Sequence, residues 1–314
     1  MHVIFGTGPL GQAVAVALRA RGIESRLVNR SGSRPAHLDR FEVVSGDLTV
    51  SSSARRAAQG ASVVYHCAAP PYPEWARTLP AMMAGAIDAA SSAGARLVYG
   101  DNLYAYAPTD QPLTEDLPEQ PQTRKGRVRK EVADALRAAH KEGRIQAVIG
   151  RGSDFYGPNV HISAAGDEVF GRLANGKSPR VLGDPDQLHS FTFIEDFGRA
   201  LVVLANQEDS FGETWHVPNA PPVATREFAA KAAQAMGRDP KVKTTPSWLL
   251  KAFGVFNPMM KEVAEMLYQW EQPFVVDHSK FKRAFGSAFG AATPLTDGIS
   301  RTAIALKRGS RPAV

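Results

Sequence analysis

The chain has 314 residues, of which 44% are hydrophobic and 22% charged, and its formal net charge at pH 7 is +6. This length and balance exclude a fibre, a peptide hormone and a small disulfide-bonded protein, and they favour a globular protein with a sizeable core. The positive charge would suit nucleic acid or another phosphate-bearing ligand. It is spread along the chain, with one local concentration at residues 123–130 and no recognised nucleic-acid-binding motif beside it. We therefore expect no nucleic-acid partner.

The sequence also bears on compartment and on metal binding. Charged residues interrupt every apolar stretch before it reaches the roughly 18 apolar residues that a membrane-spanning helix needs, so we expect no membrane association. The N-terminal segment lacks a basic region and a cleavage site, and it resembles a strand more than an export signal.

The one cysteine, Cys67, cannot form an internal disulfide, which fits a reducing compartment. We expect a cytoplasmic protein, and no metal site, because no histidine or acid cluster has ligand spacing.

The first half of the chain alternates short β-branched runs with alanine-rich segments of helical period. Strands are predicted at residues 2–8, 25–30, 41–46, 62–68, 96–102 and 145–151, and helices at residues 9–22, 52–59, 73–94 and 126–143. This alternation is typical of a parallel sheet covered by helices on both faces. Each strand is followed by a crossover long enough for a right-handed βαβ unit. The sequence therefore predicts an α/β fold with a doubly wound parallel, Rossmann-like sheet.

After about residue 152 the pattern changes to shorter elements separated by Gly, Pro and Asn. Residues 189–220 are expected to return to the sheet, while residues 225–237 and 246–270 have helical patterns. We therefore predict a dinucleotide-binding domain at residues 1–158 with returns at 189–220. A smaller, discontinuous C-terminal substrate lobe would comprise residues 159–188 and 221–306.

A glycine-rich turn follows the first predicted strand and opens an alanine-rich helix. It reads Gly6, Thr, Gly8, Pro9, Leu10, Gly11, which is a G-x-G-x-x-G pattern. Glycines let the backbone turn sharply and approach a pyrophosphate, while free N–H groups at the helix N-terminus face the negative charge. A proline in the first turn costs little because its missing N–H would have no intrahelical partner. This turn predicts a dinucleotide site.

The end of the second strand decides between the two nicotinamide cofactors. An acid there would accept from the ribose hydroxyls of NAD, whereas a cation would pair with the 2′-phosphate of NADP. Residues 29–34, at this strand end, contain no acid and two arginines, so they favour NADP over NAD. The candidate cofactor contacts in this segment are Asn29, Arg30, Ser31 and Arg34. Asp47, at the end of the third strand, could accept from the adenine amino group or cap a turn.

Together these residues resemble the extended short-chain dehydrogenase/reductase superfamily, in particular its atypical epimerase/dehydratase-like members. The resemblance is carried by the glycine turn, Gly46-Asp47-Leu48, Cys67-Ala68-Ala69, Arg151-Gly152-Ser153-Asp154-Phe155-Tyr156-Gly157-Pro158 and Phe191-Thr192-Phe193-Ile194-Glu195-Asp196. It implies a Rossmann-like fold, a nicotinamide dinucleotide and a C-terminal substrate lobe, and it adds Leu48, Cys67, Ala68, Ala69, Gly152 and Ser153 to the candidate cofactor contacts. The usual glycine spacing is G-x-x-G-x-x-G, and Phe5 stands where the first glycine would be.

The family's catalytic residues are only partly present. Its chemistry normally needs a Tyr-x-x-x-Lys pair after strand five and a Ser or Thr at the end of that strand, so that a phenol of lowered pKa passes a proton to the carbonyl oxygen. None of the 7 tyrosines has a lysine four residues later. The resemblance places Gly126 at the tyrosine, Lys130 at the lysine and Asn102 at the serine position. An amide can hydrogen-bond a substrate oxygen but cannot relay a proton.

Two accounts of the missing tyrosine stay open. In the first, Tyr104 from the loop after strand five takes its role in the space left by Gly126, with Lys130 at the ribose. In the second, no donor is restored, and the chain binds the dinucleotide without turnover or uses another acid. Candidate substrate contacts come from a rigid proline-rich turn and from the regions that the family places above the nicotinamide. They are Tyr72, Asp154, Tyr156, His161 and His189.

These observations favour an NADP-dependent oxidoreductase that acts on a carbonyl/alcohol pair of a small or medium metabolite. One alternative is an epimerase or dehydratase that uses NADP transiently, and another is a non-catalytic NADP(H) sensor. The partner is expected to be a small-molecule substrate, and a homodimer is possible because the family often pairs through helices of the central sheet.

Overall fold

The computed structural model describes residues 1–35, 38–254 and 258–309. Within them, seven strands form one parallel sheet in the order β11-β6-β5-β4-β1-β2-β3. Their bounds are β1 (His2–Phe5), β2 (Ser25–Asn29), β3 (Glu42–Ser45), β4 (Val63–His66), β5 (Arg96–Asp101), β6 (Ala147–Arg151) and β11 (Thr214–His216). The predicted doubly wound parallel sheet is confirmed.

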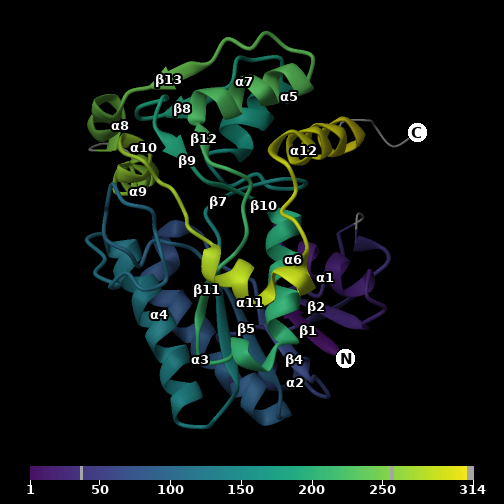
Figure 1. Ribbon diagram of the computed structural model, residues 1–314. Coiled ribbons are helices and arrows are strands. Elements are labelled where there is room, and N and C mark those ends of the chain that lie inside the picture. The colour runs from purple at the N-terminus through teal and green to yellow at the C-terminus, as the bar shows by residue number, and fades with distance from the viewer. Residues whose placement is uncertain (36–37, 255–257, 310–314) are drawn as a thin grey trace.

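Helices cover both faces of this sheet (Figure 1). One face carries α1 (Pro9–Arg19), α6 (Ile194–Ala205) and α11 (Ser279–Phe289), and the other carries α2 (Ser51–Ala57), α3 (Trp75–Ala93) and α4 (Arg124–Lys141). Burial of both faces explains why the strands read as continuous apolar runs rather than as alternating ones.

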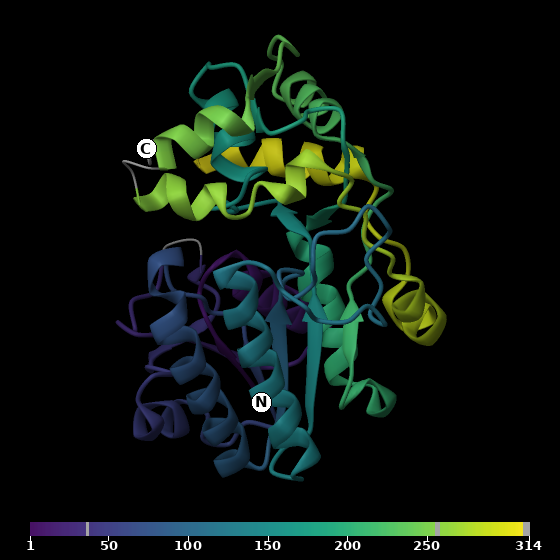
Figure 2. The same cartoon turned by 90° about the vertical axis from the view of Figure 1, so that its left-hand side faces the viewer.

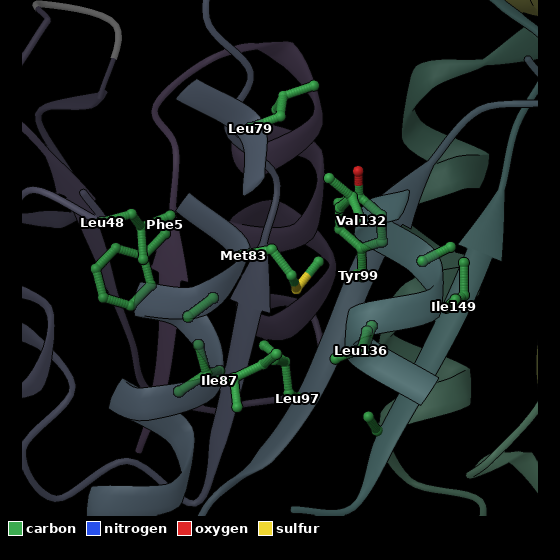
Figure 3. Packing of buried hydrophobic residues seen from close by; sticks show 14 of the residues in the cluster. Phe5, Leu48, Leu79, Met83, Ile87, Leu97, Tyr99, Val132, Leu136 and Ile149 are labelled. Atoms are coloured by element: carbon green, nitrogen blue, oxygen red, sulfur yellow. The ribbon is translucent and has the colours of Figure 1, made fainter. Parts of the chain in front are cut away.

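The core under α3 and α4 is packed from aliphatic and aromatic side chains. Met83 and Ile87 of α3 and Leu136 of α4 lie against Leu97 of β5 (Figure 3). Gly85 lets α3 approach the chain after β3, because a Cβ atom at this position would collide with the carbonyl oxygen of Leu48. Close packing of this kind fixes the positions of the strand ends.

The smaller lobe contains three short strand pairs. They are β7 (Asp154–Tyr156) with β10 (Phe191–Phe193), β9 (Leu188–His189) with β12 (Val223–Ala224), and β8 (Arg180–Leu182) with β13 (Lys243–Thr245). Its helices are α5 (Arg172–Ala174), α7 (Thr225–Ala235), α8 (Ser247–Gly254), α9 (Pro258–Ala264), α10 (Tyr268–Glu271) and α12 (Leu295–Gly309), with a π-helical turn at Gly166–Gly171. The expected helical stretch 246–270 is thus divided, and its residues 255–257 lie outside the described part.

The chain crosses between the two parts more than once. Within residues 189–220, β9 and β10 pair with strands of the smaller lobe, whereas α6 and β11 pack onto the large sheet. The arrowheads of the large sheet point toward the smaller lobe, which lies above the carboxyl ends of the strands (Figure 2). Across the described part of the chain, no helix combines the length and apolar character needed to cross a membrane.

The strand order also locates the crevice in which such sheets bind ligands. From β1 the chain proceeds to β2 on one side, and β4 lies on the other side of β1. Ligands of open α/β sheets bind outside the carboxyl ends of the strands at this reversal. The loops after β1, β4 and β5 are therefore the place to look for a site.

Candidate functional site

The glycine turn between β1 and α1 has the shape of a phosphate cradle. Gly6 has φ +121°, and a Cβ atom on it would lie 3.0 Å from the backbone nitrogen of Ala68. A Cβ atom on Gly11 would collide with the carbonyl oxygen of Gly6. Among the described residues, a Cβ atom on Gly8 would meet nothing within 4 Å. Gly6 and Gly11 therefore shape the turn, and Gly8 leaves open space before the N-terminus of α1, where Pro9 and the buried Leu10 begin the helix.

The end of β2 is tied to this turn by an amide. Asn29 Nδ2 lies 3.3 Å from Thr7 Oγ1 and donates to the carbonyl oxygen of Ser33 at 2.9 Å, and Ser31 Oγ donates to Asn29 Oδ1 at 3.2 Å. Arg30 is exposed beside this network. Arg34 is also exposed, and its guanidinium donates to the carbonyl oxygen of Asp39 at 3.3 Å. The Asn29 amide thus connects the end of β2 to the glycine turn and to Ser33. Arg30 and Arg34 lie beside it, where a 2′-phosphate would bind.

Two further loops border the crevice. Asp47 Oδ1 accepts from the backbone and hydroxyl of Thr49 at 2.8 and 2.7 Å, and these bonds hold the pKa of Asp47 below its usual range. This carboxylate therefore caps the turn before α2, with the buried Leu48 beside it. After β4, Cys67 and Ala68 are half-buried and Ala69 is exposed. Burial raises the pKa of the Cys67 thiol, so it stays protonated.

At the end of β5 the structure places a pair of phenols. Asn102 Oδ1 accepts from the backbone N–H of Tyr104 at 3.1 Å, and the hydroxyls of Tyr104 and Tyr72 are 3.2 Å apart. The Trp75 ring stacks on Tyr104 with centroids 6.1 Å apart. Burial, with the neighbouring Tyr72 and Asp154, raises the pKa of Tyr104 well above its usual value. Tyr104 is therefore a protonated phenol, and Asn102 positions it.

The N-terminal turn of α4 packs directly on the loop that carries Tyr104. A Cβ atom on Gly126 would collide with the carbonyl oxygen of Tyr104 and lie 2.7 Å from the side chain of Pro121. The glycine therefore makes room for backbone rather than for the phenol itself. The structure does not bring Lys130 into this group, because its ammonium pairs with Asp134 at 2.6 Å and its side chain is 39% exposed.

The buried cations of α4 are Lys125 and Arg129, whereas the resemblance had placed the family's lysine at Lys130. Lys125 pairs with Glu262 and, at 2.9 Å, with Glu265, and its ammonium lies 5.2 Å from the centroid of the Tyr72 ring. The Arg129 guanidinium lies 4.1 Å from the centroid of the Trp75 ring. Sequence reasoning missed both residues. The signal was their four-residue spacing, which puts them on one face of a helix.

A buried ionic network fixes Arg129 at the strand ends. Its Nη1 donates to the Tyr99 hydroxyl at 2.6 Å and to Asp101 Oδ1 at 3.2 Å. Asp101 also accepts from Arg151 at 3.0 Å, and Arg151 pairs with Glu119 at 2.8 Å. Sequence reasoning missed Asp101 as well, although an acid that ends a buried strand needs a partner. This network holds a guanidinium beside the phenols.

The smaller lobe contributes two residues to the same region. His189 Nε2 lies 3.0 Å from Asp154 Oδ2, and both side chains are largely buried. Asp154 raises the pKa of Tyr72 and of Tyr104, although burial is the larger cause for both phenols. Asp154 therefore lies near the phenol pair, and His189 contacts Asp154. Their contact with a substrate stays a prediction.

Other predicted residues of this segment lie elsewhere. Tyr156 is fully buried among rings of the smaller lobe, with centroids 5.4 Å from Phe193 and 5.2 Å from Phe228. His161 is exposed and faces Asp167 at 3.3 Å. The structure does not bring these two side chains to the phenols, because one belongs to the lobe's core and the other to its surface.

Gly152 and Ser153 connect β6 to β7. A Cβ atom on Gly152 would lie 2.8 Å from the Phe197 ring, and the backbone N–H of Ser153 donates to Thr192 Oγ1 at 2.8 Å. Both residues therefore have packing roles in this link between the sheet and the smaller lobe. Their contact with a cofactor stays a prediction.

The arrangement offers a definite chemistry. The open space at Gly8 and the helix N-terminus fit a pyrophosphate, and the two arginines after β2 fit a further phosphate. At the carboxyl end of β5, a protonated phenol could donate to an oxygen near the nicotinamide end of such a cofactor. These residues fit a bound nicotinamide dinucleotide.

Comparisons with known proteins bear on the family and the fold. Residues 3–217 match the model of the NAD dependent epimerase/dehydratase family. The chain is 25% identical over 298 residues to 3beta-hydroxysteroid-dehydrogenase/decarboxylase isoform 1 of Arabidopsis thaliana, a match that covers 84% of this chain and 66% of that protein, slightly less than two thirds of its length.

Solved structures with the same fold include sugar-nucleotide enzymes. UDP-glucuronic acid 4-epimerase from Bacillus cereus in complex with NAD is 17% identical with a TM-score of 0.77, covering 99% of this chain and 100% of that one. A double mutant of DesIV, a dTDP-glucose 4,6-dehydratase from Streptomyces venezuelae with NAD and DAU bound, is 19% identical with a TM-score of 0.78, covering 98% of each chain. The shared fold and the match over residues 3–217 lead to one conclusion: this chain belongs to the NAD dependent epimerase/dehydratase family.

Proposed function

We propose that this protein is an NADP-dependent oxidoreductase that acts on a carbonyl/alcohol pair of a small or medium metabolite, with Tyr104 as its proton donor. The observation that carries the proposal is the position of Tyr104. Its buried phenol lies near the carboxyl end of β5 and is paired with the Tyr72 hydroxyl, while Asn102 accepts from the Tyr104 backbone N–H. When bound, the nicotinamide supplies or accepts the hydride.

The choice of NADP rests on the end of β2. Residues 29–34 contain two arginines and no acid, and both arginines are exposed. Arg30 and Arg34 would pair with a 2′-phosphate, whereas nothing in this run would accept from both ribose hydroxyls of NAD. Asn29 would keep these side chains in register with the phosphate cradle, because it bonds to Thr7 in that turn.

The proton step rests on the state of the Tyr104 phenol. Its raised pKa keeps the hydroxyl protonated at neutral pH, so it can donate a hydrogen bond to a substrate carbonyl oxygen. Arrival of the hydride makes that oxygen more basic, and the proton can then pass to it.

A second candidate is an epimerase or dehydratase that oxidises its substrate and returns the hydride. The two similar solved structures, one of a 4-epimerase and the other of a 4,6-dehydratase, favour it. The same cradle and the same phenol would serve, but the cofactor would show no net change.

The test is steady-state turnover of NADPH with a panel of carbonyl compounds, together with Tyr104→Phe. This variant should lower kcat at least 100-fold and leave NADPH affinity unchanged, because loss of a general acid typically costs about 10²–10⁴-fold. Tyr156→Phe is the matched control, since Tyr156 packs in the smaller lobe. Unchanged kcat in Tyr104→Phe would remove Tyr104 from the mechanism. In a parallel assay with NADP⁺ and hydroxyl compounds, substrate conversion without net change in the cofactor would favour the epimerase or dehydratase, and binding of cofactor without turnover in either assay would favour a sensor.

A further inference from the structure

The two hydroxyls of the phenol pair differ in their access to solvent. The Tyr72 and Tyr104 oxygen atoms lie 3.2 Å apart, and either hydroxyl can donate to the other. Tyr104 is only 8% exposed, whereas Tyr72 is half-buried. A proton passes between side chains that lie within hydrogen-bond reach of one another. The shielded phenol can therefore exchange its proton with water through the more exposed one.

The loop after β4 holds Tyr72 in this position. Prolines at positions 70, 71 and 73 surround it and restrict the backbone. The indole Nε1 of Trp75 donates to the carbonyl oxygen of Pro70 at 2.9 Å. The Trp75 ring meets the Tyr72 ring edge-on, with centroids 4.9 Å apart, and stacks on the Tyr104 ring. One indole thus fixes the loop and both phenols.

The surroundings make Tyr72 the more acidic member of the pair. Burial raises the pKa of both phenols, and Asp154 also raises both. The hydrogen bond between them lowers the pKa of Tyr72 and raises the pKa of Tyr104. The Arg129 guanidinium, which lies over the Trp75 ring, lowers the pKa of Tyr72 further. A negative charge on the pair is therefore more stable on Tyr72 than on Tyr104.

We propose that Tyr72 is a proton relay that returns a proton to Tyr104 after each turnover. The proposal rests on the proposed function, because it takes Tyr104 as the donor to the substrate oxygen. The O–H bond of Tyr104 breaks as the new O–H bond of the substrate forms. The Tyr72 proton then passes to the Tyr104 oxygen, and a proton from water restores Tyr72. Tyr72 acts through Tyr104 and is a positioning residue.

The test compares the first turnover with later ones in Tyr72→Phe. Stopped-flow absorbance follows NADPH oxidation by the full-length protein with the carbonyl compound that the unaltered protein reduces fastest. The first turnover should stay within about 3-fold of the unaltered rate, because Tyr104 already holds its proton, while steady-state kcat should fall about 10-fold or more. The affinity for NADPH should not change. Phenylalanine keeps the ring against Trp75, and urea unfolding checks that the fold is intact.

Each other outcome has a definite meaning. Equal loss of the first turnover and of kcat would overturn the relay, because the hydroxyl would then act in the chemical step or in the fold. Unchanged kcat in Tyr72→Phe, with Tyr104→Phe inactive, would overturn the relay and leave the proposed function standing. Normal turnover in Tyr104→Phe would overturn both. Tyr156→Phe is the matched control, since its hydroxyl is buried in the smaller lobe, and it should change neither rate.

A second measurement needs no substrate. Carbon-13 NMR of labelled tyrosine rings in the ligand-free, full-length protein follows the ionisation of each phenol, and the two phenylalanine variants assign the signals of Tyr72 and Tyr104. Tyr104→Phe should raise the pKa of Tyr72, because the Tyr72 phenolate would lose the hydrogen bond that Tyr104 donates to it. An unchanged pKa of Tyr72 in this variant would overturn the relay, whatever compound the protein acts on.

Discussion

Replacing Gly8 by alanine should separate cofactor binding from folding. Gly8 is the N-cap of α1, with φ −72° and ψ −179°, a conformation that alanine adopts without strain. The new Cβ atom would meet no described atom within 4 Å. Alanine is a poorer N-cap than glycine by roughly 0.5–1 kcal/mol. It also restricts the unfolded chain, which stabilises the fold by about 0.4–1 kcal/mol. The free energy of unfolding should therefore change by less than about 1 kcal/mol.

The affinity for NADP should respond very differently to the same change. The methyl group would enter the space in which the pyrophosphate approaches the backbone. Losing one charge-assisted hydrogen bond costs about 1.5–3 kcal/mol, so the Kd should rise about 10- to 150-fold. Calorimetric titration gives the Kd, and urea unfolding gives the stability. Gly286→Ala in α11 is the control, because its Cβ atom would lie 3.7 Å from its nearest neighbour, the Lys282 side chain, far from the cradle. An unchanged Kd in Gly8→Ala, with the fold intact, would refute the assignment of this turn.

Three further predictions concern the cofactor's phosphate, the buried ionic network and pH. Arg30→Ala should weaken NADP binding by about 10-fold or more and leave NAD binding nearly unchanged in the same titration, because it removes one charge-assisted contact; equal losses for both cofactors would exclude the 2′-phosphate assignment. Asp101→Asn should lower the free energy of unfolding by about 3–5 kcal/mol, since it leaves two buried guanidinium groups without this carboxylate. Asp134→Asn, with its side chain 47% exposed, should cost less than about 1 kcal/mol, and similar losses for the two variants would contradict the burial argument. Burial lowers the pKa of His66 and of His216 to about 3, from an ordinary value of 6.5. Their contribution to stability should be complete above pH 6.5 and fall by about 1.4 kcal/mol per histidine for each pH unit below it, because the unfolded chain is protonated first. Urea unfolding that is independent of pH between 7 and 5 would argue against these buried neutral histidines.

The parts of the site that are local in sequence could be predicted from it. The glycine turn is an example, since Gly6, Gly8 and Gly11 form a fixed pattern between a strand and a helix, and each has a distinct steric role in the structure. The parallel sheet could also be predicted from the sequence, because buried parallel strands have a clear apolar pattern. Asn102 was placed at the end of β5, but its bond to the backbone of Tyr104 depends on the turn that follows and could not be read from residue types.

The rest depended on the helix register and on contacts between distant segments. On α4, a shift of one residue exchanges a half-exposed Lys130 for a buried Arg129, because adjacent residues of a helix point about 100° apart. Tyr156 and Asp154 are two residues apart in β7, yet only Asp154 meets His189, which lies in β9 two residues before the start of β10, the strand that pairs with β7. Such pairings across the smaller lobe leave no local trace in the sequence.

The central claim is that the turn after β1 binds the pyrophosphate of a nicotinamide dinucleotide. Calorimetric titration of the purified protein with NADP and, separately, with NAD tests it most directly. We expect one molecule of cofactor per chain, with NADP bound more tightly than NAD. Titrations that give no heat of binding, released or absorbed, beyond the heat of dilution with either dinucleotide would contradict the claim.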